Sequence, residues 1–493
     1  ALVARARLHS DSGSSASAPT LASSPGAAGF RSGCSGVEWD LEAGPAVVRD
    51  GMTILRLSFS PVSENSASLG TRVFSTIDPG ADAINGIQLL SLTSSTMYPK
   101  VGGSEGKAVT RVSPGEDAEL FPVFGAVPQD TGTAEVFLPH FGVVAGIPVV
   151  GEAEAGFDVA GALSGADPDT SKAGPYSIGS ATFVADGSSD TRKDSASTTV
   201  TVSGDVTFAS DSAELSGQAD AVLASAVEQI KRFPSGGGLA ITGHTDDVAD
   251  DAYNQTLSEK RAQAVSDRLG QLTPLSAWTV QTTGKGETEP RAQGTDDAAR
   301  AANRRVEIVI TPTGGTKPDA PQTPGEGDVP QATGPSAKGA DGVCVSGGAD
   351  DPGVTIVLDK VTRRGGLLFG EFVVSGNDQK LKFLPSYFRD SAGFGLNNAR
   401  GELGGVSSIV AASGVTLISG GNYVFPVDYL PAGADSHRPL ADLNLISLSE
   451  DGRSARICMA WPDTGEKTVI VDRPADSKYT PVPWRLTDVP VEG

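Results

Sequence analysis

One stretch in the middle of the chain constrains its fold more than any other: ITGHTDDVADDAYNQTLSEKRAQAVSDRL at 241–269. A short apolar strand is expected to end at Gly243, where a polar, acidic loop begins. Apolar residues that include Leu257 and Val265 then recur at helical spacing. Arg261 lies four residues from each of them, and therefore on or beside the apolar face of the expected helix.

An arginine in that position needs an anionic partner, because an unpaired buried guanidinium is costly. The nearest candidate is Asp246 at the end of the strand, which the loop can bring back over the first helical turn. The pair has two interpretations. One is a structural ion pair that holds the loop to the helix. The other is a site for a zwitterionic amino-acid head group, with its ammonium on Asp246 and its carboxylate on the planar fork of Arg261.

Short motifs follow one another around this pair: GHTD at 243–246, Asn254, LSEKRA at 257–262, GKGE at 284–287 and NRRVEI at 303–308. Together they resemble the OmpA-like (OmpA/MotB) peptidoglycan-binding domain, over about 198–312. The resemblance implies that Asp246 and Arg261 hold the diaminopimelate residue of the peptidoglycan stem peptide. The supporting residues that it implies are Asn254, Thr245, Leu257 and Arg304.

The length of 493 residues suggests about three domains. A hydrophobic content of 38%, with 61 glycines and 32 prolines, favours short strands joined by many turns. The formal charge of −22 argues against nucleic acid or an anionic membrane surface as a partner, since both would repel the chain. No apolar run is long enough to span a bilayer, so no transmembrane segment is expected.

Composition divides the chain into six segments. Residues 1–36 read as a flexible low-complexity tail, 161–197 as a linker and 313–341 as a Pro/Gly-rich linker. Residues 37–160 and 342–493 carry strand patterns such as MTILRLSFS at 52–60 and LLFGEFVV at 367–374. We therefore predict a multidomain protein: a central α/β OmpA-like domain of βαβαβ type at 198–312, flanked by two mainly-β, immunoglobulin-like sandwich domains.

Other candidate chemistry is sparse. Of the three cysteines, Cys344 and Cys458 bracket the C-terminal domain and form a candidate disulfide, which leaves Cys34 over. The aspartates at 246–251 lack the glycine and terminal glutamate of an EF-hand loop, and the histidines and cysteines lack zinc spacing, so no metal site is predicted. No nucleophile or phosphate-loop motif appears either. We expect neither an enzyme nor a cofactor.

These observations predict a secreted, extracellular protein of the cell wall or cell envelope. It would bind peptidoglycan non-covalently through the diaminopimelate-containing stem peptide and display its β-sandwich domains. The alternative is a structural protein of a surface layer, fibre or appendage, in which the β domains self-assemble or join other envelope proteins and the central domain is a docking module. The Gly/Ala/Asp-rich composition resembles that of high-GC bacteria and favours an actinobacterial envelope by analogy only.

Overall fold

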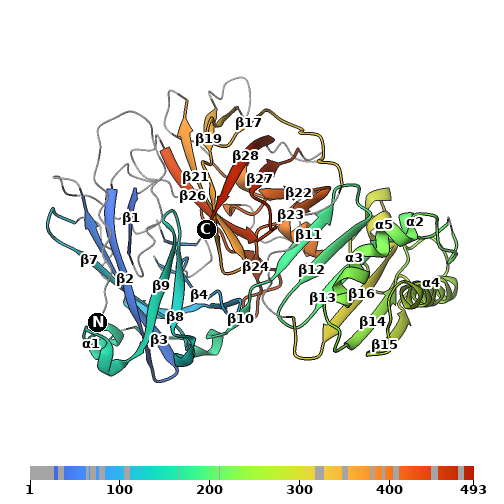
Figure 1. Ribbon diagram of the computed structural model, residues 1–493, viewed down its shortest axis with the longest axis horizontal. Coiled ribbons are helices and arrows are strands. Elements are labelled where there is room, and N and C mark those ends of the chain that lie inside the picture. The colour runs from blue at the N-terminus through green and yellow to red at the C-terminus, as the bar shows by residue number, and fades with distance from the viewer. Residues whose placement is uncertain are drawn as a thin grey trace.

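The computed structural model describes residues 27–31, 38–62, 66, 74–76, 84–104, 112–164, 166–209, 211–316, 327–346, 353–377, 381, 384–390, 395–402, 410–445, 454–475 and 482–493. These residues form mainly multi-stranded β sheets with few helices (Figure 1). No helix in these segments has the length and apolar character needed to cross a membrane.

The first sheet has ten strands, in the order β10-β5-β4-β8-β9-β2-β3-β7-β6 with β1 on β2. Phenylalanine side chains at its centre, Phe59, Phe74 and Phe141, contact one another with ring centroids 5.5–5.6 Å apart. Its elements are β1 (Ala27–Arg31), β2 (Glu38–Arg49), β3 (Met52–Pro61), β4 (Gln88–Ser91), β5 (Thr96–Tyr98), β6 (Lys100–Ser104), β7 (Ala118–Gly125), η1 (Gln129–Thr131), β8 (Thr133–Leu138), β9 (Gly142–Gly151), η2 (Glu152–Glu154), α1 (Val159–Leu163), η3 (Thr170–Lys172) and β10 (Tyr176–Ser177).

The alternating run at 52–60 forms β3, and both faces of this strand are largely buried. Leu57 and Phe59 face the main core of the first sheet. Ile54 points into a second cluster, where Val159 of α1 covers the other face. The strict alternation of buried and exposed positions that a half-exposed strand shows is absent here, and around Ile54 the reason is that helix α1 adds a layer over the sheet.

The middle of the chain contains four strands in the order β15-β14-β16-β13. Strand β14 is parallel to β15 and antiparallel to β16, which also pairs antiparallel with β13. Apolar side chains of α3 and α4 share one core with the strands, so the two helices cover one face (Figure 1). The elements are β13 (Thr198–Ser203), α2 (Gly204–Thr207), α3 (Ala219–Lys231), β14 (Gly237–Gly243), α4 (Asp251–Leu272), β15 (Trp278–Gly284), α5 (Asp297–Asn303) and β16 (Arg305–Pro312).

The segment 161–197, for which composition suggests a linker, carries strands β10, β11 (Ser180–Val184) and β12 (Ser189–Lys193). Strand β12 pairs with β13, and β11 pairs with both β12 and β23 (Asn422–Val424). The short Ser/Thr-rich strands therefore join the central strands to the C-terminal ones in a single sixteen-stranded sheet.

The C-terminal part of that sheet runs β23-β22-β27-β28-β20-β21-β19-β18, with β17 on β28 and β26 on β21. Its core contains aromatic rings in edge contact, among them Phe372, Phe388, Trp461 and Trp484. The elements are β17 (Ser336–Lys338), β18 (Val343–Val345), β19 (Val354–Val357), β20 (Val361–Arg364), β21 (Leu367–Gly376), α6 (Pro385–Phe388), α7 (Leu396–Arg400), β22 (Thr416–Ser419), β24 (Asp428–Tyr429), β25 (Arg438–Pro439), β26 (Ser454–Pro462), β27 (Thr468–Arg473) and β28 (Trp484–Glu492).

The first sheet and the C-terminal strands share a buried interface. Apolar residues from both regions, such as Phe137 and Leu367, belong to one cluster. Beside it, the buried carboxylate of Asp442 accepts hydrogen bonds from the backbone N–H groups of His140 and Cys458, both at 3.0 Å. The His140 ring nitrogen Nδ1 lies 3.1 Å from the same carboxylate.

The predicted disulfide between Cys344 and Cys458 is wrong, since both are free cysteines, Cys344 exposed and Cys458 buried. Strand β18, which carries Cys344, is separated from β26 by β19 and β21. Three strand spacings amount to about 14 Å, twice the Cα separation that a disulfide can bridge. Cys34 lies outside the described residues.

Candidate functional site

Helix α4 lies close against the ends of β14 and β15 because two glycines leave room for it. A Cβ atom on Gly243 would lie 2.1 Å from the backbone oxygen of Ser258, and one on Gly284 would lie 2.5 Å from the Ser258 hydroxyl oxygen. That hydroxyl accepts a hydrogen bond from the backbone N–H of Gly286 at 2.9 Å. The close approach brings the first turns of α4 against the loop that follows β14, which Asn254 contacts.

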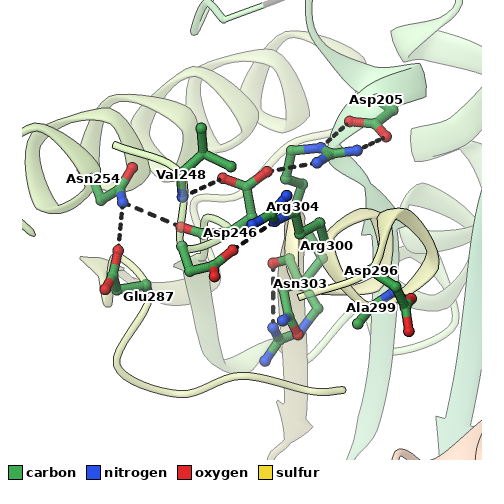
Figure 2. Close-up of polar contacts among 12 residues, drawn as sticks. Asp205, Asp246, Val248, Asn254, Glu287, Asp296, Ala299, Arg300, Asn303 and Arg304 are labelled. Carbon is green, nitrogen blue, oxygen red and sulfur yellow. Dashed lines mark hydrogen bonds and ion pairs between the residues drawn. The ribbon is translucent and has the colours of Figure 1, made fainter. Parts of the chain in front are cut away.

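Asn254, on the first turns of α4, fixes that loop (Figure 2). Its side-chain nitrogen lies within hydrogen-bond distance of the carbonyl oxygens of Asp246 (3.1 Å) and Ala249 (3.2 Å) and of a Glu287 carboxylate oxygen (2.6 Å). Asp250 caps the helix, because its carboxylate accepts a hydrogen bond from a first-turn backbone N–H at 2.9 Å. Asn254 is 2% exposed, so its amide acts on the loop rather than at the surface.

Asp246 and Arg304 form an ion pair at the end of β14. The Asp246 Oδ2 atom lies 2.5 Å from Arg304 Nη1, while Oδ1 accepts a longer hydrogen bond of 3.4 Å from the backbone N–H of Val248 (Figure 2). The other side of the Arg304 guanidinium donates two hydrogen bonds of 2.6 Å to Asp205 on α2. Hydrogen bonds to Asp205 and then to Asp246 raise the pKa of Arg304.

Arg261 points from α4 toward the segment after α2. Its Nε–H donates a 2.9 Å hydrogen bond to the backbone oxygen of Ser212, and its guanidinium carbon lies 5.1 Å from the centre of the Phe208 ring. Arg261 is 5% exposed. Burial lowers the pKa of this guanidinium, and the negative charges of Asp205 and Asp211 oppose that shift.

The direct ion pair between Asp246 and Arg261, one of the two interpretations of the sequence, is not formed. Arg304, entering from the start of β16, pairs with Asp246, and Arg261 is held by a backbone oxygen and an aromatic ring. Across the described residues, no carboxylate lies within 4.0 Å of the Arg261 guanidinium, and its two Nη atoms donate no hydrogen bond. Even so, Asp246 is close enough for its charge to act on Arg261.

The other predicted residues lie around the same loop. Thr245 is buried, its backbone N–H donates to the Gly286 oxygen at 2.9 Å, and its hydroxyl has no hydrogen-bond partner within the described structure. Leu257 is half-buried on α4, one turn before Arg261. Sequence reasoning missed Asp205, because nothing in the local pattern indicates that α2 brings it against Arg304.

His244 is a buried neutral group beside this site. It is 2% exposed, and neither ring nitrogen has a hydrogen-bond partner among the described residues. Burial, and then the positive charge of Arg305, lower its pKa to about 4, while Glu307, Glu289 and Lys285 act more weakly.

We expect His244 to make the free energy of unfolding fall as the pH drops from about 6.5 to about 4. An unfolded-state histidine binds a proton near pH 6.5 and the folded one only near pH 4, so acid favours unfolding by up to about 3 kcal/mol. His244→Phe keeps a ring there without a titrating group. Urea unfolding across this pH range should show a shallower fall for the variant, and equal slopes would contradict the assignment.

Comparison with known proteins identifies the segment that contains this site. Residues 207–304 match the OmpA family. These residues form an OmpA-family domain. The six residues predicted for ligand binding all lie within the match, whereas Asp205 lies just before it.

The OmpA-family domain has relatives among outer-membrane proteins. Outer membrane porin F of Pseudomonas aeruginosa is 38% identical over 106 residues, which are 22% of this chain and 30% of the porin. Outer membrane protein A of Escherichia coli O157:H7 is 34% identical over 120 residues, 22% of this chain and 34% of that protein. The chain thus spans about a third of the length of these curated relatives. A solved structure, the peptidoglycan-associated lipoprotein from Burkholderia pseudomallei, is 33% identical over 22% of this chain and 88% of its own, with a TM-score of 0.20.

Two strands that complete the sheet of the OmpA-family domain, β13 and β16, lie outside the matched residues. Strand β13 ends before residue 207, and β16 begins at Arg305. Both strands pair with each other, and β16 also pairs with β14, which positions the loop of Asp246. The residues predicted for ligand binding are therefore positioned in part by strands on either side of the match.

Proposed function

We propose that the OmpA-family domain binds peptidoglycan and holds this protein non-covalently at the cell envelope. The ligand would be the zwitterionic end of a stem-peptide amino acid, diaminopimelate, and no bond would be made or broken. The observation that carries the proposal is the buried Arg261 guanidinium, whose Nη atoms have no carboxylate partner in the described residues and which lies near the side chain of Asp246.

The geometry supports a division of roles between the two residues. A ligand carboxylate can accept hydrogen bonds from the free Nη atoms of Arg261, since guanidinium and carboxylate groups pair in a planar, bidentate manner. A ligand ammonium suits Asp246, whose Oδ2 already binds a cationic nitrogen at 2.5 Å. Asn254 would orient the loop, and Thr245 offers a buried hydroxyl without a partner in the described structure.

The proposal extends to the rest of the chain. Residues 198–312 would act as an α/β binding domain, and the β regions before and after it would be sandwich domains displayed outside the cell. The membership of 207–304 in the OmpA family and the names of its envelope relatives support an envelope location. The continuous pairing of β13, β12, β11 and β23 would hold the C-terminal region at a fixed position relative to the peptidoglycan-bound domain.

The test is retention of the full chain on purified peptidoglycan that contains diaminopimelate. We expect the protein to sediment with the wall. Free meso-diaminopimelate should release it, because the free amino acid and the stem peptide of the wall compete for Arg261 and Asp246. Wall whose stem peptides contain lysine in place of diaminopimelate is the matched control and should retain little protein. Equal retention on both walls, or retention that diaminopimelate does not reduce, would contradict the proposed ligand. Self-association in the absence of wall would support the assembly alternative.

A further inference from the structure

Arg304 has an arrangement that a simple structural ion pair does not require. One guanidinium group contacts two carboxylates from different elements, Asp205 through two hydrogen bonds of 2.6 Å and Asp246 through one of 2.5 Å. The backbone of Arg304 is fixed on both sides: its N–H donates to the Arg300 oxygen at 3.0 Å, and its oxygen accepts from Gly204 N–H at 2.7 Å. A change of partner would therefore involve the Arg304 side chain alone.

The contact with Asp246 occupies the oxygen that a ligand would use. Oδ1 of Asp246 faces the backbone N–H of Val248, and Oδ2 is paired with Arg304 (Figure 2). Asp246 is only partly exposed, with 14% of its side chain accessible, which limits the room for a second cation on Oδ2. An ammonium that binds Oδ2 of Asp246 therefore displaces the Arg304 Nη1 atom.

We propose that Arg304 is a resident counter-ion of Asp246 that the ammonium of the ligand displaces, so that the site selects amino-acid head groups over plain carboxylates. This inference rests on the proposed function. Displacement is easy because Arg304 keeps both hydrogen bonds to Asp205 and gives up only the third. Asp205 is thus the second, permanent partner that lets Arg304 release Asp246.

The charges around the site explain the selectivity. Three carboxylates, Asp205, Asp211 and Asp246, act on Arg261, and the nearby cation that opposes them is Arg304, so the five charges sum to −1. A ligand that carries only a carboxylate adds a negative charge to this group and leaves Arg304 in place. A zwitterion brings a cation to Asp246 and a carboxylate to Arg261, and therefore adds no net charge.

The competition has a predictable size. The apparent affinity equals the intrinsic affinity multiplied by the fraction of molecules in which Asp246 is free of Arg304. Partly exposed ion pairs are weak, so removing Arg304 should tighten the binding of diaminopimelate by about three- to five-fold. Asp205→Asn should act in the opposite direction, because Arg304 then depends more strongly on Asp246.

Titration calorimetry of the full chain tests this with two probes, meso-diaminopimelate and pimelate, which has the same carboxylates but no ammonium groups. We expect Arg304→Gln to bind diaminopimelate about three- to five-fold more tightly and to gain nothing for pimelate. Asp205→Asn should bind diaminopimelate more weakly than the unchanged chain. The matched control is Arg268→Gln, which removes the same charge from α4, where Arg268 is paired with Asp220, and should leave the affinity for diaminopimelate unchanged.

Equal or weaker binding of diaminopimelate by Arg304→Gln overturns the inference and makes Arg304 a ligand contact or a structural residue. Thermal unfolding shows that each variant is folded, and if Arg304→Gln does not fold, Asp205→Asn decides: equal or tighter binding overturns the inference. If the unchanged chain binds diaminopimelate and a variant gives one of these contrary results, the proposed role of Arg304 is wrong but the proposed function stands. Absence of diaminopimelate binding in all four proteins removes the proposed function and this inference with it.

Discussion

Arg261→Gln is expected to abolish retention on diaminopimelate-containing wall and to weaken binding of free diaminopimelate by about 30-fold or more. Glutamine offers one neutral amide where the ligand carboxylate would meet two charged Nη groups. Losing one partner of a buried, hydrogen-bonded charge pair costs about 2–5 kcal/mol, and each 1.4 kcal/mol is a factor of ten in affinity. Calorimetry and sedimentation with wall measure the loss.

The same substitution should change stability much less. Arg261→Gln loses the hydrogen bond to the Ser212 oxygen and the contact with the Phe208 ring, worth about 1 kcal/mol each, but it also relieves the burial of a charged group. Arg268→Gln is the matched control, since it removes a half-buried arginine from the same helix, where it pairs with Asp220. Full binding by a folded Arg261→Gln variant would contradict the proposed role of Arg261 in binding the ligand carboxylate.

The strand, loop and helix around Asp246 could be predicted from the sequence because each is specified locally. The apolar strand, the polar break and the helical spacing of 241–269 correspond to β14, the loop and α4. Asn254 and Arg304 were also assigned to the site through motifs, and the structure places both beside Asp246. Binding roles for these residues remain predictions.

The partners of the charged groups could not be predicted in the same way. Arg261 and Asp246 are near in sequence, but Arg304, 58 residues after Asp246, takes the carboxylate, and Asp205 arrives from a four-residue helix. The mistaken disulfide has the same origin. Cys344 and Cys458 bracket the C-terminal strands in the sequence, whereas strand order inserts β19 and β21 between them. Such contacts depend on sheet order, which local patterns do not encode.

Asp442→Ala is expected to lower the free energy of unfolding by about 3–5 kcal/mol, because it removes a fully buried acceptor shared by two regions of the chain. The backbone N–H groups of His140 and Cys458 would both lose their partner. His140 has a φ of 63°, a conformation that a non-glycine residue keeps only when its surroundings hold it, and the Asp442 hydrogen bond is one such contact. Urea unfolding followed by tryptophan fluorescence measures the change.

Two comparisons decide whether Asp442 acts on the interface alone. Asp435→Ala removes an exposed aspartate from the same region and should change stability by less than about 0.5 kcal/mol. Retention on wall should survive Asp442→Ala wherever the protein is still folded, because the core beneath Arg261 consists of α3, α4 and the central strands and shares no residue with the Asp442 interface. A variant as stable as the unchanged chain would show that the apolar cluster of Phe137 and Leu367 holds the two regions together without this carboxylate. Lost retention in a folded variant would instead show that the binding site depends on the junction between the two β regions.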